Sequence, residues 1–134
     1  MNKKFISIAA SIVWAAIVFY LHAVRVSLPK DNSLIQIPHL DKVAHCLMFA
    51  VFAFILVRML QAQTGKRVTT AQWLIVLLFC SFYGAFMEYL QAILPSQRDS
   101  DVLDWVADLI GSCLGIFLAL RNVLPSVFEA QGWK

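Results

Sequence analysis

Residues 73–94, WLIVLLFCSFYGAFMEYLQAIL, form an apolar run that contains one charged residue, Glu88, and stops at Pro95. A bilayer core about 30 Å thick requires about 20 mostly apolar residues in a helix that spans it. The run reaches that length, so it predicts a transmembrane helix. Three further runs that reach or approach this length predict three more helices, at about residues 5–24, 43–57 and 102–120.

The composition of the 134-residue chain agrees with a membrane protein. Hydrophobic residues make up 60% of the chain and charged residues 14%, against about 45–50% and about 25% in an average soluble domain. The mean hydropathy is +0.74. Because a small domain keeps much of its surface exposed, this composition excludes a soluble enzyme and a disordered tail. The net charge of +3 is too dispersed for a nucleic-acid-binding stripe, so no nucleic-acid partner is expected.

Short connectors between the four runs predict one domain over residues 1–134, an all-α integral membrane four-helix bundle. Its orientation follows from the basic residues in the loops. The N-terminus, the 58–72 loop and the C-terminal tail carry mostly basic residues, whereas the 25–42 and 95–101 loops carry as many acids as bases. Both termini are therefore expected on the cytoplasmic side. The basic residues of that side are Lys3, Lys4, Arg58, Lys66, Arg67, Arg121 and Lys134.

Polar residues within the expected helices gather near their outer ends. An ionisable residue at the centre of a span costs about 2.5–3.5 kcal/mol on insertion scales, and such residues are usually functional. Glu88 and Gln91 share one face of the third helix, as Asp104 and Asp108 do on the fourth. A rise of 1.5 Å per residue places Glu88 and Asp108 at a similar depth of roughly 9 Å. We expect the two carboxylates to be near neighbours that need a cation or a shared proton.

Further candidate side chains lie at the same outer end. Lys42 and His45 are near the start of the second helix, and Arg98 is in the last loop. His22, near the end of the first helix, is expected at the membrane interface rather than as a ligand. Gly111 and Gly115 form a small-residue motif that predicts close helix packing. The expected binding residues are Asp41, Lys42, His45, Glu88, Gln91, Arg98, Asp104 and Asp108.

In chain order, these residues resemble the VanZ-like family of small bacterial membrane proteins. The resemblance covers roughly residues 10–120 and rests on three motifs. It implies a multi-pass protein of the bacterial inner (cytoplasmic) membrane that is linked to the cell envelope. The family's name-giving member confers low-level resistance to teicoplanin, a glycopeptide antibiotic. The motifs are Asp41-Lys42-x-x-His45, Glu88-x-x-Gln91-x-x-x-Pro95-x-x-Arg98 and Asp104-x-x-x-Asp108-x-x-Gly111-x-x-x-Gly115.

One position departs from the family pattern, which usually has Asn where this chain has Asp108. The substitution adds a second deep acid beside Glu88 and would favour cation binding. No cofactor is otherwise expected. A divalent metal held by His45, Glu88, Asp104 and Asp108 would satisfy the chemistry of these ligands.

Four interpretations of the polar residues stay open. In the first, they form a pocket for an envelope lipid, a lipid-linked envelope precursor or a glycopeptide-related ligand, and Arg98 and Lys42 bind its phosphate. In the second, they belong to an intramembrane enzyme, whose candidate catalytic residues are His45, Glu88, Asp104 and Asp108. In the third, they form an internal hydrogen-bond network that only fixes the bundle. In the fourth, they relay ions or protons across the membrane. The oligomeric state is left open, and membrane lipids are expected partners.

Overall fold

The computed structural model describes residues 2–23, 40–93 and 101–121, and this part of the chain forms four helices. Each helix is long and apolar enough to cross a membrane, and the described residues contain no strand. The predicted all-α membrane bundle is therefore confirmed. The side of the membrane that each terminus faces stays a prediction. The helices are α1 (Lys3–Ala23), α2 (Leu40–Thr64), α3 (Thr70–Ile93) and α4 (Val102–Leu120).

The α2 helix is longer than its apolar run, so the predicted end at residue 57 is wrong. Arg58 marks the end of the apolar segment, but backbone hydrogen bonding continues, and its guanidinium donates to Gln61 Oε1 at 2.9 Å. The helix stops where Gly65 takes a φ of +65°, in the left-handed region that glycine adopts without strain. Hydropathy therefore located the span and missed the last turns of the helix.

The α3 helix also starts before its apolar run, at Thr70 rather than at residue 73. Thr69 and Gln72 form a reciprocal capping box: the Thr69 amide donates to Gln72 Oε1 at 2.9 Å, and the Gln72 amide donates to Thr69 Oγ1 at 3.4 Å. Such a box satisfies backbone N–H groups that have no partner within the helix. The capping residues, rather than hydropathy, set the start of α3.

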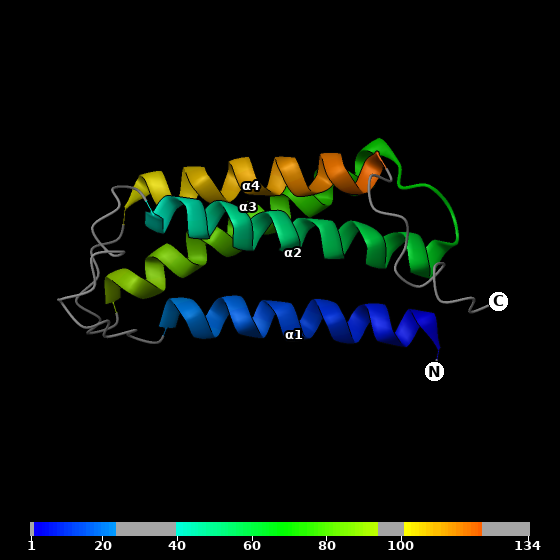
Figure 1. The fold of residues 1–134 in the computed structure, drawn as a ribbon, viewed down its shortest axis with the longest axis horizontal. Helices are drawn as coiled ribbons and strands as arrows, with labels where there is room; N and C mark the ends of the chain where they lie inside the picture. Colours follow the sequence, from blue (N-terminus) through cyan, green and yellow to red (C-terminus); the bar gives the residue numbers. More distant parts are fainter. Residues whose placement is uncertain (1, 24–39, 94–100, 122–134) are drawn as a thin grey trace.

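The helices run alternately up and down, so that α1 and α3 point one way and α2 and α4 the other (Figure 1). The last turns of α1 and α3 therefore meet the first turns of α2 and α4 at one end of the bundle. We call this end, bounded by Ala23, Leu40, Ile93 and Val102, the polar end. Among the described residues, it collects the buried acids and histidines.

The closest helix pair is α2 and α4. A Cβ atom added at Gly111 would collide with the Cys46 carbonyl oxygen, and one added at Gly115 would collide with that of Ala50. Both positions therefore lie where the two backbones approach too closely for any side chain. The close packing predicted from the small-residue motif is confirmed, and it holds the middle of α4 against α2.

Aromatic side chains fill the interior, where Phe49 and Phe52 are almost completely buried. Trp14 Nε1 donates to the Met48 carbonyl at 3.1 Å, and Tyr83 donates its hydroxyl to the Ala15 carbonyl at 2.8 Å, so α1 is tied to α2 and α3. Large apolar side chains such as Phe82 cover the outside of the bundle. An outer surface of this kind suits lipid better than water.

Candidate functional site

The polar end brings together seven of the eight predicted binding residues. They come from the start of α2, the last turns of α3 and the start of α4. The eighth, Arg98, lies outside the described residues. Whether the set binds a ligand stays a prediction. The seven are Asp41, Lys42, His45, Glu88, Gln91, Asp104 and Asp108.

Lys42 joins α2 to the start of α4 through two carboxylates. Its Nζ lies 2.6 Å from Asp101 Oδ2 and 2.8 Å from Asp104 Oδ1. Asp101 is also the N-cap of α4, and its side chain accepts a hydrogen bond from the Leu103 amide at 2.9 Å. The hydrogen bond from Lys42 lowers the pKa of the Asp101 carboxyl below its usual value. The ammonium group of Lys42 is thus already neutralised by acids of α4.

His45 and Asp108 form a buried pair in the centre of the polar end. His45 is 1% exposed and Asp108 0%, and His45 Nδ1 lies 3.0 Å from Asp108 Oδ1. The absence of a side chain at Gly84 makes room for the carboxylate, because a Cβ there would lie 2.7 Å from Asp108 Oδ2. A carboxylate accepts, so Nδ1 donates, and in the neutral ring Nε2 then carries the lone pair. That nitrogen can accept a proton or bind a metal ion.

Glu88 contacts the backbone at the start of α4 instead of Asp108. Its Oε2 accepts a hydrogen bond of 3.1 Å from the Asp101 amide. Its Oε1 is buried and has no hydrogen-bond partner among the described residues, as is true of Asp108 Oδ2. The two carboxylates therefore make separate contacts. Whether they share a cation or a proton stays a prediction. The number of residues between a side chain and the membrane surface does not determine which residue of the neighbouring helix it faces. The hydrogen bond from the Asp101 amide shows that Glu88 lies level with Asp101.

His22 belongs to the same cluster, although its position near the end of a helix predicted a residue at the membrane interface. It is 4% exposed, and the centroid of its ring lies 4.7 Å from that of His45 at an interplanar angle of 78°. Its Nδ1 lies 2.7 Å from the Val18 carbonyl oxygen, which can only accept. The sequence spacing could have indicated this burial, because Ser11, Val18 and His22 recur at intervals that place them on one face of α1, and all three are buried.

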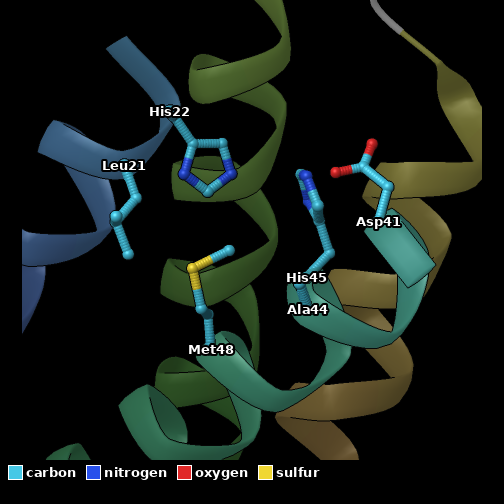
Figure 2. Close-up of a pocket in the computed structure, with 6 residues that line it drawn as sticks. All are labelled: Leu21, His22, Asp41, Ala44, His45 and Met48. Atoms are coloured by element: carbon cyan, nitrogen blue, oxygen red, sulfur yellow. The ribbon is translucent and has the colours of Figure 1, made fainter. Parts of the chain in front are cut away.

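A pocket of about 170 Å³ opens between α1 and α2 beside the two histidines. Figure 2 shows the His22 ring and the Asp41 carboxylate turned toward His45, with Met48 below them. One side of the lining is therefore polar and the other apolar. The lining residues are Leu21, His22, Asp41, Ala44, His45 and Met48.

One group of side chains in the described part has the spacing of a metal site. Ligand atoms of Asp41, His45 and Asp104 all lie within 4.8 Å of one another. This group differs from the predicted set, because Asp108 contacts the His45 ring and Glu88 contacts the Asp101 amide. Asp41 takes their place. His45 and Asp104 are common to both sets.

A comparison with protein families gives one match. The model of the family described as VanZ/LLP1 matches residues 4–124, a range that includes nearly all of the described residues. Comparisons with curated proteins and with solved structures gave no match. The match extends over all four helices and therefore over every side chain of the polar end.

Proposed function

The chain belongs to the VanZ/LLP1 family of multi-pass membrane proteins, and from this premise we propose that it binds the polar headgroup of a cell-envelope component at its polar end. The component is a lipid or a lipid-linked precursor in the bacterial inner membrane. Binding there lowers susceptibility to teicoplanin, as the family resemblance implies.

The pocket between α1 and α2 is the observation that carries this proposal. Its lining combines the polar groups of His22, Asp41 and His45 with the apolar side chains of Leu21 and Met48. Ligand sites are typically concave and mostly apolar, with a few polar groups that fix orientation. A pocket at the end of a membrane bundle whose lining is polar on one side and apolar on the other suits a polar headgroup attached to a hydrocarbon chain.

The polar lining favours a headgroup that donates hydrogen bonds. Asp41 offers carboxylate oxygens, and His45 offers the Nε2 lone pair left by its bond to Asp108. Hydroxyl and amine groups match such acceptors. Lys42 is less suited to capturing phosphate than its sequence position suggested, because Asp101 and Asp104 already neutralise it. We therefore propose a sugar or amine headgroup as the bound moiety.

Filling the pocket tests the proposal. Ala44 is an exposed helical alanine that lines the pocket, and Ala71 is an exposed helical alanine at the opposite end of the bundle. The full chain, its Ala44→Phe variant and its Ala71→Phe variant would be purified in native lipid nanodiscs, and the retained lipids identified by mass spectrometry. We expect one lipid class to be enriched with the parent chain and with Ala71→Phe, and lost with Ala44→Phe. Equal lipid profiles in all three would overturn the proposal and leave the network as a structural feature.

A further inference from the structure

We propose that Asp41, His45 and Asp104 form a binding site for a divalent transition-metal ion such as Zn²⁺. The carboxylates are on different helices, so the ion would connect the first turns of α2 and α4. The ion would use the His45 Nε2 lone pair in place of a headgroup hydrogen bond. The inference does not require headgroup binding, because metal content is measurable without any lipid.

The spacing of the three side chains is close to that of a bound site. Their ligand atoms lie within 4.8 Å of one another. Zn²⁺ bonds of about 2.0–2.2 Å place two tetrahedral ligands about 3.3–3.6 Å apart. The remaining contraction, at most about 1.2–1.5 Å, is within the reach of side-chain rotation, since Asp41 is exposed at the start of α2. Three protein ligands leave a further coordination position open to water or to an oxygen of a bound molecule.

Asp108 prepares His45 for this role. Metal-binding histidines almost always donate their second ring N–H to a carboxylate or carbonyl group, which fixes the tautomer and the ring orientation. His45 has this arrangement already, because Nδ1 donates to the fully buried carboxylate of Asp108 at 3.0 Å. The lone pair is thereby held on Nε2, so no tautomer change is needed when the metal ion arrives.

Charge at the polar end also favours a cation. Among the residues that the structure describes there, five carboxylates accompany a single lysine, Lys42. Of the two carboxylate oxygens of Asp104, Lys42 contacts Oδ1, so Oδ2 remains able to bind a metal ion. A divalent cation would place positive charge beside these carboxylates. The five acids are Asp41, Glu88, Asp101, Asp104 and Asp108.

The imidazole ring of His45 indicates which cation fits. His22 packs against His45 with ring centroids 4.7 Å apart, and its Nδ1 donates to the Val18 carbonyl. Imidazole suits Zn²⁺ and other transition metals, whereas Mg²⁺ and Ca²⁺ prefer oxygen ligands alone. We therefore expect Zn²⁺ to bind more tightly than Mg²⁺.

Metal content of the purified full chain tests this site. The chain would carry an affinity tag without histidine, be stripped with a chelator, and be dialysed against Zn²⁺ or Mg²⁺ before elemental analysis by mass spectrometry. The expected result is about one Zn²⁺ per chain and little Mg²⁺. Substoichiometric Zn²⁺ in a folded parent chain would overturn the proposal.

Two ligand variants and one control identify the site. Asp41→Asn and His45→Gln should each weaken Zn²⁺ binding at least tenfold. Asp101→Asn removes a neighbouring carboxylate that also contacts Lys42 but is not a ligand, so it should retain Zn²⁺. Circular dichroism would establish that each variant folds. Because Asp41 is exposed, Asp41→Asn keeps the test decisive if His45→Gln does not fold. Retention of Zn²⁺ in Asp41→Asn, or equal losses in Asp41→Asn and Asp101→Asn, would contradict the assignment.

Discussion

His45 Nδ1 donates a 3.0 Å hydrogen bond to Asp108 Oδ1, and both side chains are buried where α2, α3 and α4 meet. Of the ion pairs among the described residues of the polar end, this pair is the most deeply buried. It links the two helices that pack most closely, next to the close approach of the backbones at Gly111. The pair therefore contributes both to the orientation of the His45 ring and to the register between α2 and α4.

Substitutions at Asp108 should separate the hydrogen bond from the charge. In Asp108→Asn the amide oxygen can still accept from His45 Nδ1, so we expect a small loss in the free energy of unfolding. In Asp108→Leu the buried N–H loses its partner, which costs about 1–3 kcal/mol. Unfolding of both variants in the same detergent would measure the difference. Equal losses would show that the charge, and not the hydrogen bond, provides the stabilisation.

The glycines of α4 should be intolerant of any side chain. Gly111→Val places a side chain against the Cys46 carbonyl oxygen, which the two backbones can relieve only by separating. Overpacking of this kind typically costs about 1–3 kcal/mol. Cys113→Val introduces the same side chain at an exposed position of α4 and serves as the control. We expect a lower unfolding midpoint for Gly111→Val only, and equal midpoints would contradict the tight packing of α2 on α4.

The Asp101–Lys42 bridge should make stability depend on pH in the acid range. The pKa of Asp101 is lowered from its ordinary value of 3.8, chiefly by the hydrogen bond from Lys42. A carboxyl whose pKa is lower in the folded state stabilises it above the unfolded pKa, and this contribution is lost as the pH falls through the folded pKa. The parent chain should therefore lose more unfolding free energy than Asp101→Asn between about pH 5 and the folded pKa.

Unfolding curves of the two proteins over that pH range would measure this difference. Other buried acids titrate in both proteins, so only the difference between the two curves reports on Asp101. Parallel curves would mean that the bridge to Lys42 adds nothing to stability in solution.

The sequence predicted the four spans and the end of the bundle at which the polar residues gather. Apolar length is a direct consequence of bilayer thickness, and a helix order that alternates up and down sets which ends meet. The partners within the site could not be predicted in the same way. Asp108 faces His45 and Glu88 faces Asp101 because of the rotation of each helix about its axis. Sequence spacing fixes the shared face of one helix but not its rotation against a neighbour.

His22 is a second residue whose partner depends on the arrangement between helices, which sequence spacing does not give. Its position near a helix end predicted an interfacial residue, yet burial against His45 depends on how α1 lies beside α2. Arg98, which the sequence placed among the binding residues, lies outside the described residues and stays a prediction. The cross-helix arrangement thus added one histidine to the candidate site and changed the predicted metal set.

Substitution of Glu88 should show whether the polar end acts on teicoplanin susceptibility. Glu88 Oε2 accepts from the Asp101 amide at 3.1 Å, and the amide oxygen of glutamine can accept the same bond. Glu88→Gln therefore removes the charge while keeping the contact that holds the start of α4. A sensitive host expressing the parent chain should tolerate more teicoplanin than the same host without it, and this protection should fall in Glu88→Gln.

Two controls make that susceptibility test specific to the site. Membrane levels of parent and variant must be matched by immunoblot, because any change in folding would alter protection through abundance. Ala71→Phe, at the opposite end of the bundle, should protect as well as the parent, while Ala44→Phe, which fills the pocket, should not. Vancomycin measured in parallel separates an effect on teicoplanin from a general change in the envelope. Equal protection by the parent, Glu88→Gln and Ala44→Phe would remove the polar end from the mechanism, because neither its charge nor its pocket would then matter.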